Sequence, residues 1–366
     1  MSRELFVEVV PNFPLIHMPT CEDYFQIPLQ VAEQIGMDVK VLADTKYIQT
    51  SNPLFRRYPL EFHKGPMRVL RRLRSLQPAM VHAQSVYPAA YLAGAVAGSP
   101  AFFTPHGLMN DPQAPLHSKI QVLEHLMAPL ALRSFIKVIC VSQHEYEGYR
   151  RRGFANLALL PNPIDYDYLS TAGATHARDF RKRHNIHTEF VLVHISTLWE
   201  IKNPTVIVQA HHELRKRGLD TTLVMAGPLH FRSQERDRFR TACVEAGKVV
   251  LPGQLDFPQI REALAAADAC VISSDWETQC IVAYEAAAAG VPLFLSSIPT
   301  LQRTFGPLAT YHPPRDPQVL ADNLEGFLLR QHKRKRKLAL QAFAKKHSIT
   351  NYCRHLRQMY QTCLRQ

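Results

Sequence analysis

Short apolar segments alternate with segments of helical periodicity through the first half of the chain. Runs of four to six mostly apolar residues predict buried strands at 5–10, 38–42, 80–83, 101–104, 137–141 and 157–160. Apolar residues spaced three and four apart predict helices between several of these strands, at 24–35, 67–76 and 116–132. Strands that alternate with helices in this way predict a parallel sheet covered by helices on both faces.

The pattern is interrupted near residue 165 and then resumes. Pro161 and Pro163 lie within three residues and break any regular element, with Asn162 between them as a turn residue. Strands are then predicted at 190–195, 222–226, 249–251, 269–272 and 293–295, and helices at 204–217, 232–246, 257–267, 281–289 and 317–329. At roughly 150 residues per domain, a chain of 366 residues with this arrangement predicts two α/β domains.

We therefore predict two Rossmann-like parallel-sheet domains that face a central cleft. The N-terminal domain is expected over 1–168 and the C-terminal domain over 169–337. The remaining residues, 338–366, are predicted to form helices that pack on the N-terminal domain. Sheets of this kind bind ligands beyond the carboxyl ends of their strands, and a cleft between two such domains is the natural place for a site.

The segment from Glu277 to Glu285 is the strongest chemical signal in the sequence. It connects a predicted strand to an Ala-rich helix that ends at Gly290. The first backbone N–H groups of such a helix are unpaired and carry positive potential, so they can seat a phosphate. Glu277 on the turn can reach sugar hydroxyls, and Glu285, about two turns further on, can bind a ribose diol. Two Glu residues alone also fit a surface carboxylate and a half-buried one on an ordinary helix.

The net charge of +12 favours anionic partners, such as phosphates, anionic lipid or nucleic acid. The basic residues gather at 71–74, 150–152 and 333–337. The segment 67–76 is amphipathic, which fits either a core-packed helix with a solvated basic face or a helix on an anionic membrane. The run 330–337 most simply forms a solvated surface; a nucleic-acid patch and a site for a lipid-phosphate acceptor are the alternatives.

Cysteine usage and the apolar segments bear on the compartment. The seven cysteines are scattered without a CxxC pair, which argues against a zinc ribbon, a thioredoxin-like site or a disulfide framework and indicates a reducing compartment. Glu4 and Glu8 argue against a secretory leader. No apolar stretch reaches the roughly 20 residues that a spanning helix needs. We expect a cytoplasmic protein, with peripheral contact at the inner face of a membrane as an alternative.

Several segments resemble the motifs of the retaining GT-B glycosyltransferases of family 4. Glu277 and Glu285 are separated by seven residues, as in the family's E-x7-E motif, and EAAAAGVPLFLSS resembles its EAMAxGxPVVAS. Thr104-Pro-His-Gly107 resembles the His-Gly that follows a first-domain strand. The stretch from Val141-Ser142 to LLPNPID resembles the family's domain junction. The resemblance is strong over 190–300, moderate over 100–168 and weak before residue 100.

The resemblance implies a binding site for a nucleotide sugar. Lys202, in a segment similar to GRLxxxKN, would bind the donor diphosphate and stabilise the leaving group. Glu285 would hold the nucleotide ribose, Glu277 would contact the donor sugar, and His106 would contact that sugar from the opposite domain. The other donor-binding residues that the resemblance implies are Thr197, Gly227, Thr278, Gln279, Cys280 and Ile281.

The activity implied by the resemblance is the transfer of a sugar, of the hexosyltransferase type, to a glycan, glycolipid or small-molecule acceptor. A leaving nucleoside diphosphate develops negative charge, so fixed cations and helix N-termini lower the barrier. Retaining enzymes of this kind are thought to react on one face of the sugar, so no dedicated nucleophile is expected. We also expect no metal and no cofactor, a nucleotide sugar and a glycan or lipid-linked acceptor as partners, and no nucleic acid.

Three departures from the family pattern leave alternatives open. Thr197 stands where the family has an arginine, and the stretch 13–22 lacks the family's glycine-rich loop. The motif begins Glu277-Thr-Gln-Cys280 in place of the commoner Glu-Gly-Phe-Gly. One alternative is a GT-B protein with altered activity that acts as a binding subunit. Another is a polyanion-binding protein, which would need aromatic residues among its basic runs; the run 333–337 has none.

Overall fold

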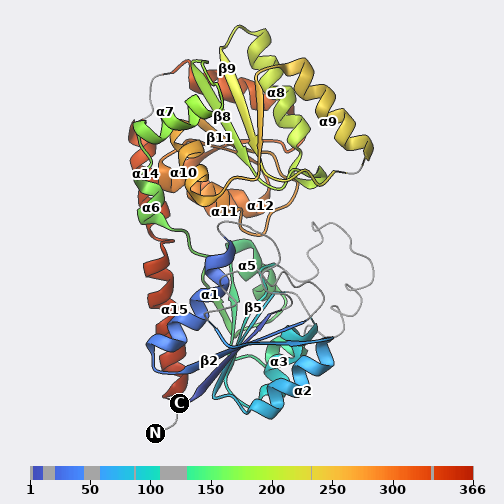
Figure 1. Cartoon of the computed structure of the whole chain (residues 1–366), viewed down its shortest axis with the longest axis vertical. Helices are drawn as coiled ribbons and strands as arrows, with labels where there is room; N and C mark the ends of the chain where they lie inside the picture. The colour runs from blue at the N-terminus through green and yellow to red at the C-terminus, as the bar shows by residue number, and fades with distance from the viewer. Residues whose placement is uncertain are drawn as a thin grey trace. The chain divides into compact units, whose positions relative to one another are not determined.

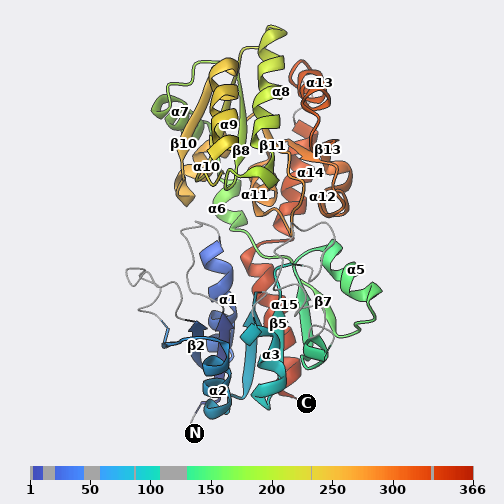
Figure 2. The ribbon, with the colours of Figure 1, turned by 90° about the vertical axis from the view of Figure 1, so that its right-hand side faces the viewer.

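The structure is a computed structural model, and it describes residues 3–10, 21–44, 58–85, 88–107, 130–231, 233–330 and 334–365. The chain divides into two compact units. One unit consists of Met1–Asn162 with Thr350–Gln366, and the other of Pro163–Ile349. Each unit is a sheet flanked by helices (Figure 1, Figure 2). The predicted α/β class with two parallel sheets is confirmed.

The first unit is built on a seven-stranded parallel sheet of order β3-β2-β1-β4-β5-β6-β7. Its strands are β1 (Leu5–Val10), β2 (Asp38–Asp44), β3 (Leu60–His63), β4 (Met80–Gln84), β5 (Ala101–Thr104), β6 (Lys137–Cys140) and β7 (Leu157–Leu159). Only β3 was not predicted, because its residues are half-buried and no apolar run marks it. Instead, the Glu61 carboxylate on β3 accepts hydrogen bonds from Lys40 and Arg72. The Arg72 guanidinium lowers the Glu61 pKa to about 2.

The helices of the first unit are α1 (Cys21–Gln34), α2 (Pro66–Leu76), α3 (Pro88–Ala97), α5 (Gln143–Arg151) and α15 (Ile349–Leu364). Val69, Leu70 and Leu73 of α2 are buried in the core, so the amphipathic segment 67–76 is a packed helix with a basic outer face. All but the last three residues of the helix predicted over 116–132 lie outside the described residues, as does most of the stretch 13–22. Among the described residues, no helix is long and apolar enough to cross a membrane.

The C-terminal helix α15 packs on the sheet of the first unit. The ring centroid of Tyr360 lies 5.5 Å from that of Phe6 on β1 and 5.0 Å from that of Phe102 on β5. Its hydroxyl lies 2.6 Å from Nδ1 of the buried His82 on β4. Such aromatic contacts stabilise a core by about 0.5–1.5 kcal/mol each beyond the area that they bury. Residues from the two ends of the sequence therefore share one core.

The second unit is built on a six-stranded parallel sheet of order β10-β9-β8-β11-β12-β13. Its strands are β8 (Phe190–Ile195), β9 (Thr221–Ala226), β10 (Val249–Gly253), β11 (Ala269–Ile272), β12 (Leu293–Ser296) and β13 (Ala309–His312). Its helices are α6 (Tyr166–Ser170), α7 (Ala174–Arg183), α8 (Pro204–Lys216), α9 (Ser233–Ala246), α10 (Phe257–Ala266), α11 (Ile281–Ala289), α12 (Pro299–Phe305), α13 (Pro317–Leu328) and α14 (Arg334–Lys345). The strand β13 and the helices α6, α7 and α12 were not predicted.

The boundaries of the two observed units differ from those of the predicted domains. The first change of unit falls between Asn162 and Pro163, not at 168/169. In the C-terminal segment, α14 belongs to the second unit, where Leu340 and Ala344 are fully buried in its core. The Gln341 amide also donates to the Ala288 carbonyl of α11 at 3.2 Å. Only α15 packs on the first unit, because the apolar residues of α14 face α11.

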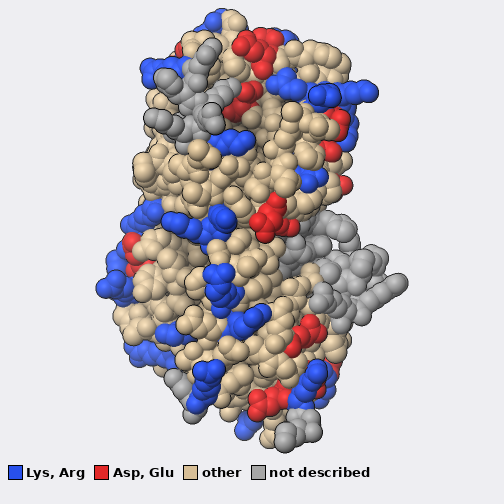
Figure 3. Space-filling view, turned by 90° about the vertical axis from the view of Figure 1, so that its left-hand side faces the viewer, with Lys and Arg blue, Asp and Glu red and all other residues tan. Residues whose placement is uncertain are grey.

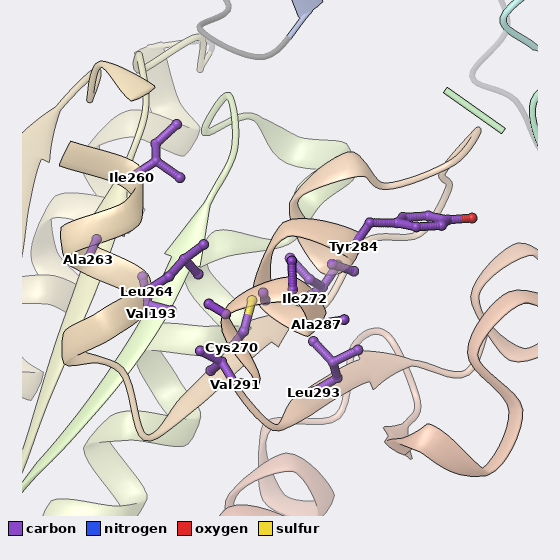
Figure 4. Packing of buried hydrophobic residues seen from close by; sticks show 14 of the residues in the cluster. Val193, Ile260, Ala263, Leu264, Cys270, Ile272, Tyr284, Ala287, Val291 and Leu293 are labelled. Atoms are coloured by element: carbon purple, nitrogen blue, oxygen red, sulfur yellow. The ribbon is translucent and has the colours of Figure 1, made fainter. Parts of the chain in front are cut away.

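Small side chains bring α11 close to its sheet. Ala283, Ala286, Ala287 and Ala288 are all fully buried. Figure 4 shows Ala287 among its neighbours from β11 and β12. A helix that packs through alanine approaches a sheet more closely than one that packs through leucine, so the residues at its start are held firmly relative to the strand ends.

Candidate functional site

The candidate site of the second unit lies where three neighbouring strands end. β8 is followed by Ser196 and Thr197, β9 by Gly227, and β11 by the turn from Ser273 to Cys280. Because β9, β8 and β11 are adjacent and parallel, these segments lie along one carboxyl edge of the sheet. Open α/β sheets bind ligands at this edge.

Gly227 allows the chain after β9 to lie against the end of β8. Its φ is 134°, and a Cβ atom there would lie 1.8 Å from the Ser196 carbonyl oxygen. No side chain fits such a position without a shift of the backbone. Gly227 therefore shapes the edge next to Ser196 and the half-buried Thr197.

Lys202 and Glu277 form an ion pair at this edge. Lys202 Nζ lies 2.6 Å from Glu277 Oε1, and the Ser274 hydroxyl donates to the same oxygen at 2.7 Å. The two charged side chains are 18% and 10% exposed, so solvent can still reach both. The pair brings together two residues that are 75 positions apart and that were predicted as site residues separately.

Asn203 fixes the turn that carries Lys202. Its φ is 47°, in the left-handed region that asparagine tolerates better than most residues. The Asn203 amide donates to the Ser273 carbonyl at 2.9 Å and to Asp275 Oδ1 at 2.8 Å. The Asp275 backbone N–H donates to the Ile201 carbonyl at 2.9 Å. These bonds hold the Lys202 turn against the Glu277 turn, and the sequence analysis had not singled out Asn203.

The turn after Glu277 leads into the N-terminus of α11. Thr278 is partly exposed, Gln279 and Cys280 are buried, and Ile281 is the first helical residue. Cys280 has a φ of 62° and makes no capping hydrogen bond with its side chain. It therefore adopts the left-handed conformation at the place where the commoner family motif has glycine. Burial raises the pKa of the Cys280 thiol, which argues against a role as a nucleophile.

Glu285 lies within α11, on its buried side. The residue is 3% exposed, and no hydrogen bond to its carboxyl group is formed within the part of the chain that the structure describes. Burial raises its pKa to about 8. A buried carboxyl group without a protein partner is costly, and a ligand that supplies hydroxyl donors would remove that cost.

His194 was not predicted, although a histidine within the apolar run of β8 is a signal of a polar function. It is fully buried, with Nδ1 2.8 Å from the Val271 carbonyl oxygen and Nε2 2.7 Å from the Ser196 hydroxyl oxygen. Burial lowers its pKa to about 4, so the ring is neutral. Its hydrogen bonds tie the end of β8 to β11, which orients Ser196 beside Gly227.

His106 lies in the first unit, two residues after β5. Its φ is 57°, its Nε2 lies 2.8 Å from Gln84 Oε1, and its Nδ1 lies 3.4 Å from Asn162 Nδ2. Burial lowers the pKa of His106 to about 3. The next residue, Gly107, donates its N–H to Glu145 Oε1 at 3.2 Å. The sequence analysis named His106 but missed Gln84 and Glu145.

The structure thus gathers most of the predicted site residues at one sheet edge of the second unit. Lys202 and Glu277 touch, and the turn 278–281 leads from Glu277 into the helix of Glu285. Thr197 and Gly227 follow the neighbouring strands. His106 lies at a strand end of the other unit. Within the described residues, no group of His, Cys, Asp and Glu side chains is arranged to hold a metal ion.

Two family models match adjoining parts of the chain. Residues 176–346 match the model described as glycosyl transferases group 1, and residues 33–168 match the model described as glycosyltransferase family 4. The chain belongs to the family 4, group 1 glycosyltransferases. No curated protein sequence matches it.

Solved glycosyltransferase structures resemble this protein along almost its whole length. Alr3699/HepE of Anabaena, in complex with UDP, superposes with a TM-score of 0.80 at 16% identity, covering 99% of this chain and 100% of that one. Sucrose-phosphate synthase of Thermosynechococcus elongatus gives 0.70 at 16% identity, with 98% of each chain covered. A UDP-forming trehalose-phosphate synthase of Burkholderia vietnamiensis gives 0.74 at 12% identity, with 100% of each chain covered. These likenesses show that this glycosyltransferase has the GT-B fold.

Proposed function

We propose that this glycosyltransferase transfers a hexosyl group from a nucleoside diphosphate sugar to a glycan or lipid-linked acceptor, with retention of configuration and without a metal ion. The observation that carries the proposal is the Lys202–Glu277 pair beside the uncapped N-terminus of α11. A cation, a helix N-terminus and two carboxyl groups match the diphosphate, the sugar and the ribose of a nucleotide sugar. UDP is the first nucleotide to test, because UDP is bound in the similar HepE structure.

In the proposed reaction, the bond between the anomeric carbon and the β-phosphate oxygen breaks while the acceptor oxygen bonds to that carbon on the same face. The acceptor hydroxyl proton passes to a phosphate oxygen of the leaving diphosphate. Lys202 and the first N–H groups of α11 stabilise the charge that develops there. Glu277 accepts hydrogen bonds from the donor sugar, Glu285 accepts them from the ribose hydroxyls, and His106 contacts a sugar hydroxyl. No protein nucleophile takes part.

The ion pair bears on how the donor binds. In the structure, the Glu277 carboxylate partly neutralises the Lys202 ammonium group. A diphosphate carries more negative charge than one carboxylate, so it draws the Lys202 ammonium towards itself and leaves Glu277 to the sugar hydroxyls. Donor binding therefore couples the position of the cation to the position of the sugar.

The proposal is tested with the full chain and a panel of nucleotide sugars. Binding is measured by calorimetry with UDP and with the nucleoside diphosphates of other bases, and hydrolysis or transfer by release of the diphosphate. Proton NMR of the product gives the anomeric configuration. Turnover in the presence of a chelator, with retention, supports the proposal. Binding without turnover would instead favour a binding subunit with altered activity, and failure to bind any nucleotide sugar would contradict the proposal.

We also propose peripheral contact with an anionic membrane on the cytoplasmic side, where polysaccharide or glycolipid synthesis takes place. After Glu325 the sequence contains eleven Lys and Arg residues and no Asp or Glu. On α15, Arg354 and Arg357 are exposed while Leu356 and Tyr360 are buried. Figure 3 shows Lys and Arg side chains spread over the side on which α15 lies. Each basic residue near an anionic surface contributes about 1 kcal/mol to binding.

Sedimentation with vesicles tests this contact. We expect binding to vesicles that contain anionic lipid, no binding to neutral vesicles, and release as the salt concentration rises. The variant Arg354→Gln/Arg357→Gln should bind more weakly, whereas Arg238→Gln on α9 of the second unit serves as the matched surface control. Equal binding to neutral and anionic vesicles would contradict the proposal, and binding to nucleic acid in preference to vesicles would favour a polyanion-binding role.

A further inference from the structure

A line of hydrogen bonds runs from a buried carboxyl group to His106 in the first unit. Glu8 on β1 is fully buried, and its Oε1 accepts a hydrogen bond from the Gln84 amide nitrogen on β4. The amide oxygen of Gln84 lies 2.8 Å from His106 Nε2. Glu8 pairs with His82 in the register of β1 and β4, so Glu8 and Gln84 lie on the same face of the sheet.

These contacts fix which atom of Gln84 faces the imidazole ring. Burial raises the Glu8 pKa well above its usual value, and Glu8 Oε2 has no hydrogen-bond partner within the described residues. In the structure the Gln84 amide nitrogen donates to Oε1, so Oε1 is the acceptor of this hydrogen bond. Gln84 then presents its carbonyl oxygen to His106.

The orientation of Gln84 in turn selects the tautomer of His106. An amide oxygen only accepts hydrogen bonds, so the His106 Nε2 that faces it must carry a proton. Burial lowers the pKa of His106 to about 3, so the ring holds a single proton near neutral pH. With that proton on Nε2, Nδ1 is left as a hydrogen-bond acceptor.

The backbone beside His106 is held as firmly as its ring. The Gly107 N–H donates to Glu145 Oε1 at 3.2 Å, and the Tyr149 hydroxyl donates to the Gly107 carbonyl at 3.2 Å. Both partners lie on α5. The clamp keeps His106 in its left-handed conformation, with φ at 57°, and so fixes the direction of the ring.

The Asn162 contact at Nδ1 of the ring is longer than the Gln84 contact at Nε2. Asn162 Nδ2 lies 3.4 Å from His106 Nδ1, beyond the usual range of an N–H hydrogen bond, whereas the Gln84 contact measures 2.8 Å. A ligand hydroxyl that donates to Nδ1 at normal distance would make a shorter bond than this Asn162 contact.

We propose that Glu8 and Gln84 are positioning residues that hold His106 as its Nε2–H tautomer, so that Nδ1 accepts a hydrogen bond from a hydroxyl of the donor sugar. The second part rests on the proposed function; the tautomer does not. The line of bonds explains why a charged residue and an amide occupy fully buried positions on the two central strands β1 and β4.

The tautomer is measured directly on the nucleotide-free full chain. Long-range proton–nitrogen correlation spectra of protein labelled at histidine distinguish the two neutral tautomers, and the spectrum of His106→Asn assigns the signal. We expect a neutral Nε2–H ring from about pH 6 to about pH 8. Among the described residues, the titratable groups near this line of bonds include Glu8, His82, Glu145, Tyr149 and Tyr360. A neutral Nδ1–H ring, or a doubly protonated one, would overturn the proposal.

Three variants test whether Glu8 and Gln84 set the tautomer of His106. Glu8→Leu frees the Gln84 amide to turn, and Gln84→Met removes the acceptor, so both should populate the Nδ1–H tautomer. Glu8→Gln keeps an acceptor oxygen for the Gln84 amide and should restore the Nε2–H form. Thermal unfolding checks that each variant is folded. Unchanged Nε2–H signals in both Glu8→Leu and Gln84→Met would show that the line of bonds does not set the tautomer.

Kinetics test the link to the sugar. If His106 accepts a bond from the donor sugar, Gln84→Met should lower kcat/KM for the nucleotide sugar about five- to tenfold, the effect of one lost hydrogen bond, and leave the affinity for free nucleoside diphosphate unchanged. Absence of turnover in the wild type, together with the expected tautomer, would contradict the proposed function alone. The expected tautomer shift without any loss of kcat/KM would overturn the proposed contact between Nδ1 and the sugar.

Discussion

The two units hold the buried carboxyl groups of their sheets and adjoining helices in opposite situations. In the first unit, Glu145 accepts the backbone N–H groups of Val141 at 2.6 Å and Gly107 at 3.2 Å, and Glu8 accepts from Gln84. In the second unit, Glu277 is paired with Lys202, and Glu285 has no hydrogen-bond partner within the described residues. The first edge uses its carboxyl groups to hold the protein in shape, whereas the second leaves hydrogen-bonding capacity for a ligand.

This difference suggests separate roles for the two edges. The proposed phosphate and ribose contacts come from a rigid edge whose polar groups are incompletely matched until the nucleotide arrives. The proposed sugar contact comes from His106, whose ring and backbone are held by hydrogen bonds with Gln84 and around Gly107. Substitutions at the two edges should therefore differ in whether they change ligand binding or the protein itself.

The largest effect is expected from Gly227→Ala, which breaks the geometry of the second edge. The added Cβ would lie 1.8 Å from the Ser196 carbonyl oxygen, and φ is 134°. We expect a loss of about 3 kcal/mol or more in the free energy of unfolding, measured by urea titration, because the backbone must move. Gly253→Ala is the matched control, since its φ is 76° but no atom lies within 4 Å of the added Cβ. Equal losses in the two variants would show that close approach is not the cause.

The next largest effect is expected from Lys202→Ala, which removes the cation of the second edge. We expect kcat to fall about ten- to hundredfold, because a charge-assisted hydrogen bond to the leaving diphosphate contributes about 1.5–3 kcal/mol. Lys248→Ala is the control, since Lys248 also forms an ion pair, 2.7 Å from Asp220, but precedes β10 and lies at the opposite edge of the sheet. An unchanged kcat in Lys202→Ala would remove this residue from the mechanism.

The two edges also differed in how far the sequence predicted them. Lys202, Glu277 and Glu285 lie in segments that resemble a known motif, so residues distant in sequence could be predicted to share one site. Of the three, Lys202 and Glu277 are in contact. The parallel sheets followed from apolar runs. In contrast, β3 was not predicted because it has no buried apolar face. Glu61 and its basic partners stabilise this strand instead.

The hydrogen bonds that link Glu8, Gln84 and His106 could not be predicted from the sequence, for a physical reason. Glu8 and Gln84 are separated by 76 residues, and only strand pairing brings them together. In the sequence, Glu8 was interpreted only as evidence against a secretory leader. A charged residue in the middle of a predicted buried strand also indicates a buried polar contact. The boundary near α14 was misplaced because helical periodicity shows that a helix has an apolar face but not which core that face joins.

A smaller effect is expected on nucleotide binding by Glu285→Ala. The carboxyl group is buried without a partner, so its replacement should leave the fold intact while removing the proposed acceptor for the ribose hydroxyls. We expect the affinity for UDP, measured by calorimetry, to fall about tenfold. Glu262→Ala on α10 of the same unit is the control, because that carboxylate is paired with Arg183 on the surface. If both variants bind UDP as the wild type does, Glu285 does not contact the nucleotide.

The last comparison concerns stability and pH, and it tests the two edges directly. Burial raises the pKa of both Glu145 and Glu285 to about 8. The folded protein therefore keeps protons that the unfolded chain releases above about pH 4.5, so each group lowers stability as pH rises towards 8, by at most about 1.4 kcal/mol per pH unit.

Replacing each glutamate by glutamine, which cannot ionise, distinguishes the hydrogen-bonded Glu145 from Glu285, which has no hydrogen-bond partner among the described residues. Glu285→Gln has no protein bond to lose, so its thermal midpoint should equal that of the wild type at about pH 5 and exceed it at about pH 8. Glu145→Gln places an amide NH2 group against a backbone N–H donor, so it should be less stable at about pH 5, by about 1–3 kcal/mol. If both variants shifted stability in the same direction at about pH 5, the two carboxyl groups would not differ in their partners, and the contrast between a structural edge and a ligand-binding edge would fail.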